Sequence, residues 1–192
     1  MGFTRAELES FRDAVIADLI GPDCRLLFVG INPGLWTAAT GAHFARPGNR
    51  FYPALYRAGI VDRVIDASAG MKPEDRDLLI ERGVGITNMV HRATARADEL
   101  SADEFREGAA ELVATVERVA PRVVAVAGIT AYRMAFGEKK AAAGRQDRRL
   151  GDSAISDAEV WVVPNPSGLN AHHTVDTLAQ AYREAALAAG VV

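Results

Sequence analysis

The fold of this chain is decided by the stretch Leu26-Leu27-Phe28-Val29-Gly30-Ile31-Asn32-Pro33-Gly34. An apolar run ends abruptly at a glycine, and an Asn-Pro-Gly turn follows. Short apolar runs bounded by turn residues are typical of fully buried strands, and Pro33 cannot continue the strand because it has no N–H for the ladder. Asn32 is therefore expected where a buried strand opens into a loop, which is the edge of an open α/β sheet at which ligands bind.

A second Asn-Pro turn repeats this arrangement late in the chain. There the apolar run Val160-Trp161-Val162-Val163 leads into Pro164-Asn165-Pro166-Ser167-Gly168-Leu169. Two such strand ends in one domain indicate a shared site at the edge of the sheet.

The composition predicts one soluble domain over residues 1–192. Hydrophobic residues make up 49% of the chain, enough for one core, and no apolar run approaches the roughly 20 residues that span a bilayer. The N-terminus lacks the apolar stretch of a signal peptide. The only cysteine, Cys24, leaves no internal disulfide and no Cys-rich metal or iron–sulfur site. We expect a cytoplasmic monomer that binds no membrane.

Charge is distributed unevenly along the chain. The net charge of −3 argues weakly against a nucleic-acid partner, but the segment 24–61 contains no acidic residue, and 138–149 carries five basic residues against two acidic ones. A basic face of this kind suits contact with phosphates. Solvated helix faces remain the plainer explanation for most charge runs.

Apolar spacing, capping boxes and turn residues predict helices that alternate with strands. The expected helices are 4–20, 49–58, 73–81, 101–119, 130–136 and 174–189, and the expected strands are 25–30, 83–88, 122–127 and 159–163. A long loop precedes the second helix, and 137–151 is expected to be a flexible basic connection. This order predicts an α/β protein, a three-layer α/β/α sandwich around a mainly parallel central sheet.

Taken together, the motifs resemble those of a known family. The matching segments are Gly30–Leu35, Thr40-Gly41, Pro47–Phe51 and Asn165–Leu169. Their combination resembles the mismatch-specific uracil/thymine-DNA glycosylases of the uracil-DNA glycosylase superfamily. Gly85–Thr94 is similar to a stretch of the thymine-DNA glycosylases, with further likeness at Glu104–Gly108. The resemblance runs from about Arg25 to Glu184 and implies the uracil-DNA-glycosylase-like fold.

The resemblance implies an enzyme of base-excision repair. Such an enzyme hydrolyses the N-glycosidic bond of uracil opposite guanine in double-stranded DNA, with thymine and etheno-cytosine as secondary substrates. Asn32 is expected to orient the attacking water; an amide positions water but hardly deprotonates it, which suffices because the bond breaks through an oxocarbenium-like sugar. No lysine lies in either Asn-Pro motif to form a Schiff base, so lyase activity is not expected.

The resemblance also implies how the base and the duplex are held. The base-binding residues are expected to be Ile31, Phe44, Thr37, Asn88 and Asn165. Phe44 would stack on the flipped base, the alternative being an ordinary core ring. The bulk of Thr37 would favour uracil over thymine by excluding the thymine methyl. N–H groups of the 30–35 turn would stabilise the departing base.

Leu169 matches the family's wedge, which fills the gap left in the duplex. Ser167, Gly168, Asn170 and His172 are expected to contact DNA with it. The chain departs from the bacterial enzymes here, because Asn170-Ala171-His172-His173 stands where they often have Ser-Arg. Asn170 and His172 are thus the candidates to replace that arginine. No metal is expected at the paired histidines, since no cysteine or carboxylate cluster accompanies them at ligand spacing, and no cofactor is expected.

Two rival hypotheses stay open. One is a non-catalytic mismatch-binding module of the same fold. The other is a small-nucleotide or phosphate-binding α/β protein, which is disfavoured because the chain has neither a Gly-Lys-Ser/Thr phosphate loop nor a Gly-x-Gly-x-x-Gly motif. Trp36 receives no role from the sequence.

Overall fold

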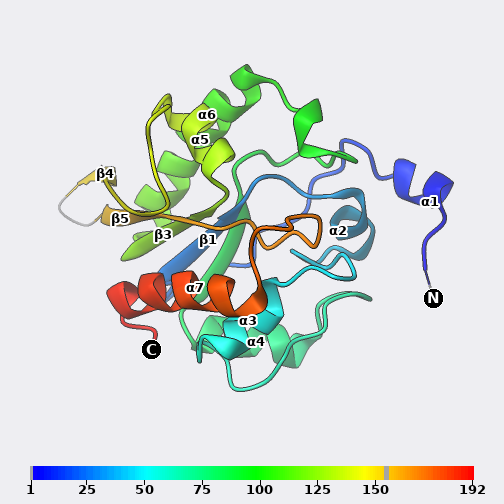
Figure 1. The fold of residues 1–192 in the computed structure, drawn as a ribbon, viewed down its shortest axis with the longest axis horizontal. Coiled ribbons are helices and arrows are strands. Elements are labelled where there is room, and N and C mark those ends of the chain that lie inside the picture. Colours follow the sequence, from blue (N-terminus) through cyan, green and yellow to red (C-terminus); the bar gives the residue numbers. More distant parts are fainter. Residues whose placement is uncertain (1, 154–155) are drawn as a thin grey trace.

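The computed structural model describes residues 2–153 and 156–192. A five-stranded sheet in the order β2-β1-β3-β5-β4 forms its centre (Figure 1). The strands are β1 Leu26–Gly30, β2 Val84–Asn88, β3 Val123–Ala127, β4 Gly144–Ser153 and β5 Ser156–Val163. The first four neighbours in the sheet run parallel, and β4 is antiparallel to β5. The prediction of a mainly parallel sheet is confirmed.

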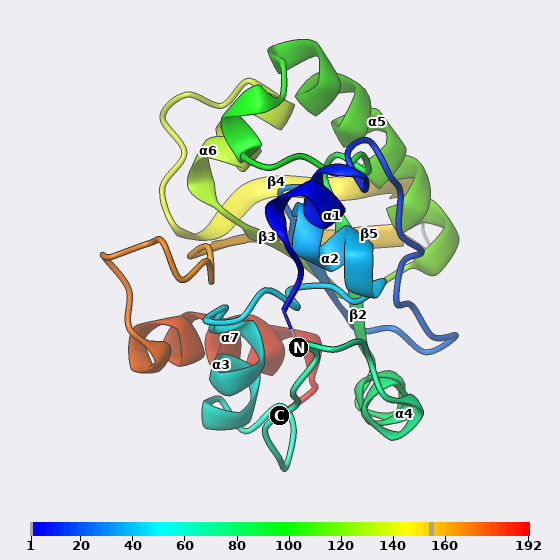
Figure 2. The ribbon, with the colours of Figure 1, turned by 90° about the vertical axis from the view of Figure 1, so that its right-hand side faces the viewer.

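Helices cover both faces of this sheet. The α-helices are α1 Arg5–Glu9, α2 Leu35–Thr40, α3 Phe51–Arg57, α4 Pro73–Glu81, α5 Ala102–Val119, α6 Ile129–Phe136 and α7 Val175–Ala189, and η1 Ala97–Glu99 is a 3₁₀ turn. In Figures 1 and 2, α5 and α6 lie on one side of the sheet, and α3, α4 and α7 lie on the other. The expected three-layer architecture is therefore confirmed. No helix in the described part of the chain is long and apolar enough to cross a membrane.

The central strand β1 shows why the sheet is buried on both faces. Leu26 and Phe28 pack into the cluster formed with α3 and α7, and Leu27 and Val29 pack into the cluster formed with α5 and α6. A strand buried on both faces has a continuous apolar sequence rather than an alternating one.

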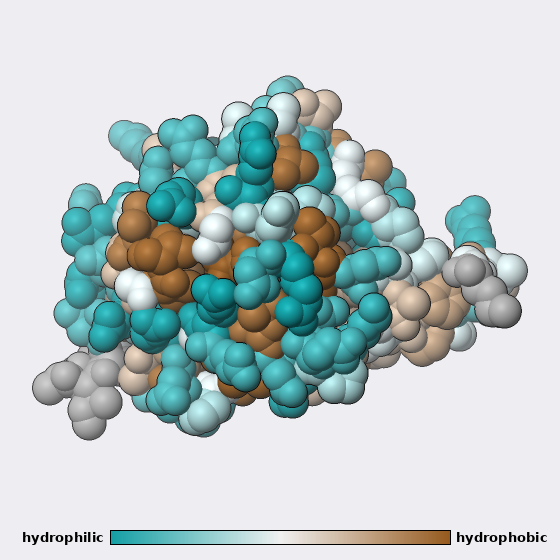
Figure 3. Space-filling model, turned by 90° about the horizontal axis from the view of Figure 1, so that it is seen from below, coloured by the Kyte–Doolittle hydropathy of each residue, from teal (hydrophilic) through white to brown (hydrophobic). Residues whose placement is uncertain are grey.

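Figure 3 shows the molecule from below the view of Figure 1, and the hydrophobic areas of this surface are interrupted by hydrophilic side chains.

The predicted helix over 4–20 is wrong beyond its first turns. The capping box of Thr4 and Glu7 is present, but α1 ends at Glu9. Asp13 has a left-handed φ of 63°, and Leu19 exchanges two backbone hydrogen bonds with Ile86, at 2.9 and 2.7 Å. The segment after α1 thus pairs with the outer edge of β2. An exposed sheet edge that needs hydrogen-bond partners outweighs local helical periodicity here.

Two further predictions are corrected. The long loop after β1 contains a short helix, α2, which ends at Gly41 in the left-handed conformation. The expected flexible connection contains β4, an edge strand paired with β5. Arginines of β4 pair with neighbouring carboxylates, Arg145 with Glu159 and Arg149 with Asp157. Charged side chains are a common feature of edge strands, and here their partners offset much of the positive charge that the sequence shows.

Candidate active site

The candidate site lies at the carboxyl edge of the sheet, where the strand ends converge. Gly30, the last residue of β1, is in register with Asn88, the last residue of β2. On the other side of β1, Ile31 and Asn165 line one pocket of about 400 Å³. Gly128, which follows β3, lines the same pocket. The ends of β1 and β5 therefore share a site even though β3 separates the two strands.

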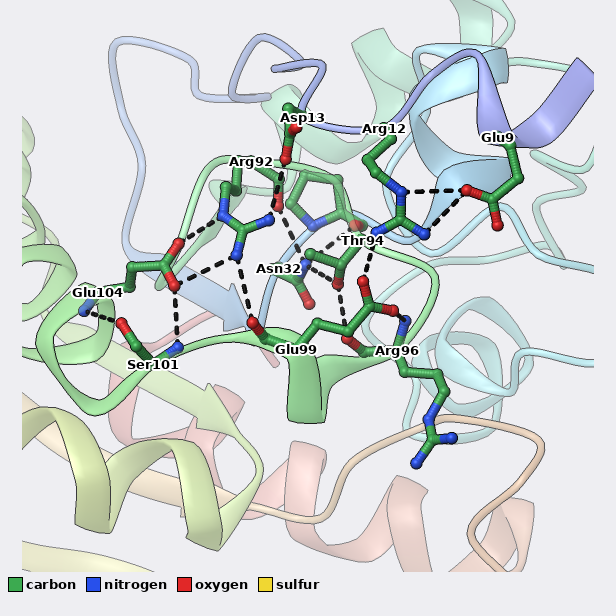
Figure 4. Close-up of polar contacts among 11 residues, drawn as sticks. Glu9, Arg12, Asp13, Asn32, Arg92, Thr94, Arg96, Glu99, Ser101 and Glu104 are labelled. Carbon is green, nitrogen blue, oxygen red and sulfur yellow. Dashed lines mark hydrogen bonds and ion pairs between the residues drawn. The ribbon is translucent and has the colours of Figure 1, made fainter.

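The side chain of Asn32 has one defined orientation. Its Nδ2 donates to the carbonyl oxygen of Arg92 at 3.0 Å, to Oγ1 of Thr94 at 2.8 Å and to the carbonyl oxygen of Pro33 at 3.2 Å (Figure 4). With the amide nitrogen committed to these acceptors, the carboxamide oxygen must face the other way. The one buried side-chain polar atom without a partner in the described chain is Nε of Arg50. The oxygen of Asn32, for which the described residues provide no donor, therefore meets solvent.

The loop that holds Asn32 is itself anchored by an ion-pair clamp, formed by Asp13, Arg92 and Glu104. Nε of Arg92 lies 2.5 Å from Glu104 and its Nη1 lies 2.9 Å from Asp13 (Figure 4). The hydrogen bonds from Arg92 lower the pKa of Glu104 to about 2, so this carboxyl stays ionised at neutral pH. The clamp ties the loop to α5 and to the segment after α1.

Backbone bonds complete this support. The N–H of Thr94 donates to the carbonyl oxygen of Pro33 at 3.1 Å, and Oγ1 of Thr94 donates to that of Arg96 at 2.8 Å. Oγ1 thereby keeps its lone pairs for Nδ2 of Asn32. Sequence reasoning missed Arg92 and Thr94 as site residues, although both lie in the quoted Gly85–Thr94 motif. Their roles depend on which strand ends are neighbours, and that is not a local property of the sequence.

Phe44 and Asn88 meet over the end of β1. A Cβ built on Gly30 would lie 2.6 Å from Oδ1 of Asn88 and 3.3 Å from Cζ of Phe44, so only glycine fits there. Phe44 has a left-handed φ of 55°, and its ring stacks on Phe51 with centroids 4.0 Å apart. The ring thus has one face on the core while the residue stays half-buried. Both sequence hypotheses for Phe44, core ring and stacking platform, fit this position.

Thr37 and Trp36 both lie on α2. Thr37 is buried. The indole N–H of Trp36 donates to the carbonyl oxygen of Ser68 at 2.9 Å, and Phe3 packs edge-on to its ring. Trp36 therefore joins α2 to two other segments of the chain. It also lines a pocket of about 470 Å³ with Arg46 and residues of α1, and none of the predicted base-binding side chains lies in that pocket.

The loop 165–173, which we call the Leu169 loop, is held by the half-buried guanidinium of Arg50. Nη2 of Arg50 donates to the carbonyl oxygens of Ser167 and Asn170 at 2.5 and 2.6 Å, and its Nη1 donates to that of His173. A Cβ on Gly168 would lie 2.6 Å from the carbonyl oxygen of Gly48. The loop therefore packs tightly against the 46–50 segment. Leu169 projects from it with 78% of its surface exposed.

The polar side chains of the Leu169 loop are used within the loop. Oδ1 of Asn165 accepts from the N–H of Ser167 at 2.9 Å, and Nδ2 of Asn170 donates to the carbonyl oxygen of Asn165 at 3.2 Å. Asn165, Asn170 and His172 line the pocket of about 400 Å³ with Ile31. Among the residues described by the structure, no three His, Cys, Asp or Glu side chains gather as a metal site.

Comparisons with known proteins agree with this architecture. Residues 17–189 match the sequence model of the family described as "Uracil DNA glycosylase superfamily". A solution NMR structure from Methanosarcina acetivorans, to which the function of a uracil DNA glycosylase is attributed, superposes with a TM-score of 0.58. The match covers 90% of this chain and 96% of that chain at 12% sequence identity. At this identity the likeness concerns the fold.

Proposed function

The chain belongs to the uracil DNA glycosylase superfamily, and from that premise we propose that it is a monofunctional, mismatch-specific glycosylase. Its proposed substrate is uracil opposite guanine in double-stranded DNA, with thymine and etheno-cytosine as secondary substrates. The observation that carries the proposal is the orientation of Asn32, whose Nδ2 is bound to Arg92 and Thr94 while its oxygen faces outward.

In the proposed reaction, Asn32 holds the attacking water through its carboxamide oxygen. The bond between C1′ and N1 breaks, its electron pair leaves with the base, and the water oxygen bonds to C1′ of the oxocarbenium-like sugar. An amide takes up no proton at neutral pH, so the water gives its proton to the departing base or to solvent. Because the nucleophile is only oriented, a slow enzyme is expected. The reaction requires no metal or organic cofactor.

The base must leave the stack before it reaches this water, which costs a few kcal/mol and is easiest at a mismatch. Leu169 is the proposed wedge, because it is exposed on a loop that Arg50 holds in place. Phe44 is the proposed stacking platform, and Asn170 and His172 the proposed contacts to the opened duplex. The buried Thr37 is proposed to disfavour the thymine methyl. We propose that one monomer binds the duplex.

Alkali treatment of labelled duplexes tests the proposal, since it cuts the strand at abasic sites. The substrates are G·U, G·T and A·U duplexes and single-stranded uracil DNA, and the proteins are the wild type and Asn32→Ala. Wild-type cleavage of G·U above G·T, with cleavage lost in Asn32→Ala and DNA affinity retained, supports the proposal. Asn49→Ala serves as a control, because that side chain accepts from the N–H of Phe51 and not from the Asn32 loop.

Other outcomes would favour one of the two rival functions or refute the role of a single residue. Binding of mismatched DNA without cleavage of any substrate would identify a mismatch-binding module. Weak DNA affinity that does not change with salt would favour the small-nucleotide alternative, because phosphate contacts make duplex binding strongly salt-dependent. Equal cleavage by wild type and Asn32→Ala would refute the role of Asn32, and equal rates on G·U and G·T would refute that of Thr37.

A further inference from the structure

The segment 137–143, which joins α6 to β4 and which we call the basic loop, carries two of the three lysines of the chain, Lys139 and Lys140. Both residues are exposed. Glu138, the acid next to them, forms an ion pair with Arg148 at 2.5 Å. Among the residues that the structure describes, neither lysine has an acidic partner. The proposed function does not use this loop.

Side-chain hydrogen bonds fix the backbone of the basic loop. Nε of Arg133 donates to the carbonyl oxygen of Ala141 at 3.0 Å. Nε2 of Gln146 donates to the carbonyl oxygens of Ala142 and Gly144, in each case at 2.7 Å. These oxygens would repel an anion, and here they face donors of the protein instead. A loop held in this way before a ligand arrives loses less conformational entropy on binding.

The basic loop lies beside the Leu169 loop at the carboxyl edge of the sheet. Because β4 is antiparallel to β5, Gly144 is in register with Val162, near the carboxyl end of β5. Ala143 accordingly lines the pocket of about 400 Å³ together with Asn165. In Figure 2 the basic loop (yellow) and the Leu169 loop (orange) protrude on the same side of the molecule. The basic loop therefore continues the surface from which Leu169 projects.

A hollow of about 570 Å³ opens between the basic loop and the first residues of β4. Lys139, Lys140 and Arg145 line it, and the side chain of Arg145 is 59% exposed. The acids of the lining are Glu138, which is paired, and Asp147. Cations therefore predominate in the hollow, and exposed cations around a concave surface attract a phosphate backbone.

The order of the strands places this hollow relative to the DNA. β2 and β4 are the two ends of the sheet, and the base is proposed to stack on Phe44, over the end of β1. The Leu169 loop follows β5, so it lies between the base and the basic loop. Phosphates that reach the hollow therefore belong to the part of the duplex that lies beyond the wedge, seen from the flipped base.

We propose that the basic loop is a second DNA-contact surface, which binds backbone phosphates beyond the Leu169 wedge. Lys139 and Lys140 each neutralise one phosphate. Contacts to phosphates carry no sequence information, so the loop strengthens the binding of matched and mismatched duplexes alike. This inference rests on the proposed function, because the wedge defines which part of the duplex the loop meets.

The salt dependence of DNA binding tests the proposal. Fluorescence anisotropy measures the affinity for a labelled G·U duplex at increasing NaCl, in the Asn32→Ala background so that the DNA stays intact. Each phosphate that a lysine neutralises contributes about 0.9 to the slope of log affinity against log salt. In Lys139→Gln/Lys140→Gln we expect the slope to flatten by about 2 and the affinity at low salt to fall about tenfold, with a G·C duplex as with G·U. An unchanged slope would overturn the proposal.

Lys72→Gln/Arg76→Gln is the matched control. It removes the same charge from two exposed residues at α4, which covers the other face of the sheet (Figure 2). We expect the slope to change by less than about 0.5. Equal losses in the two double variants would mean that net charge alone sets the affinity, and would overturn the contact.

Truncated duplexes locate the contact. Shortening the duplex beyond the wedge should weaken binding by the protein with both lysines and leave Lys139→Gln/Lys140→Gln unaffected, whereas shortening the other side should weaken both equally. Equal responses to both truncations would overturn the location. A wild type that binds with the expected slope but cleaves no base would refute the proposed function alone. A wild type that cleaves uracil, with unaltered affinity in Lys139→Gln/Lys140→Gln, would refute only the role of the basic loop.

Discussion

The two Asn-Pro turns of this protein are alike in sequence and are supported in opposite ways. At the first turn, the Asn32 side chain is bound to a neighbouring loop, which an ion-pair clamp ties to α5 and to the segment after α1. At the second turn, Asn165 is bonded within its own loop, and Arg50 holds that loop from outside. The first arrangement fixes one oxygen atom, and the second displays one exposed side chain, Leu169.

This difference fits what each region is proposed to do. A water molecule must be held to within a fraction of an ångström of its productive position, since small misplacements cost large factors in rate. An apolar wedge entering a duplex needs exposure and a firm base rather than an oriented atom. The shared Asn-Pro dipeptide is therefore compatible with two different proposed roles, depending on what packs around it.

The largest expected effect comes from the same substitution made at both turns. In Asn32→Ala the carboxamide oxygen that is proposed to hold the water is lost, so we expect single-turnover cleavage of G·U to fall by at least about 10²-fold. In Asn165→Ala the side chain loses one hydrogen bond within its own loop, from the N–H of Ser167, and we expect a change of less than about threefold. Similar losses in both variants would erase the contrast between the turns.

Glycine substitutions should disturb the Asn32 region and the Leu169 loop separately. Gly30→Ala places a Cβ against Asn88 and Phe44, and Gly168→Ala places one against the backbone of Gly48. We expect the first to lower the cleavage rate about tenfold or more and the second to weaken DNA binding, measured by fluorescence anisotropy. Gly34→Ala is the matched control, because nothing lies within 4 Å of its Cβ. A Gly34→Ala defect as large as the others would mean that steric fit is not the cause.

Removing the clamp should slow the chemistry without weakening DNA binding. In Arg92→Met the loop behind Asn32 loses its ties to Glu104 and Asp13, and we expect the single-turnover rate at saturating DNA to fall about tenfold. Arg96→Met is the control, because that side chain is exposed and, among the residues that the structure describes, forms an ion pair only with Asp98. A change in DNA affinity with no change in rate would contradict the assignment.

Arg50→Lys should weaken DNA binding without slowing the chemistry. A lysine cannot donate to three carbonyl oxygens in the planar geometry of a guanidinium, so the Leu169 loop loosens and we expect DNA affinity to fall several-fold. Arg57→Lys, at an exposed pair with Asp176, controls for a general change of basic residue. Combined with Arg92→Met, the effects should add as free energies if the regions are independent.

The smallest effect concerns pH. The pKa of Glu104 is lowered to about 2, so its contribution to stability is complete above the ordinary range near 4.5 and is lost as pH falls toward 2. Thermal unfolding of the wild type and of Glu104→Gln should therefore differ at pH 7 and converge only as the pH falls to about 2. A difference that grows on acidification would contradict this sign.

The sequence by itself determined the four parallel strands and the residues at their carboxyl ends. Strands buried on both faces are apolar along their whole length, and a proline ends them. The local sequence pattern therefore predicts β1 and the turn that holds Asn32. The helices α4, α5 and α7 were predicted within one residue at each end, because caps and periodicity are local as well.

The tertiary structure alone decided which groups hold these residues. The segment after α1 is extended because it pairs with the edge of β2, and β4 is a strand because β5 offers a free edge. Arg50 and Arg92 each form hydrogen bonds with residues far away in the chain. Hydrogen bonds between distant segments depend on distances that only packing sets. The position of Asn32 in the fold follows from its neighbours in sequence. The orientation of its amide follows from its neighbours in space.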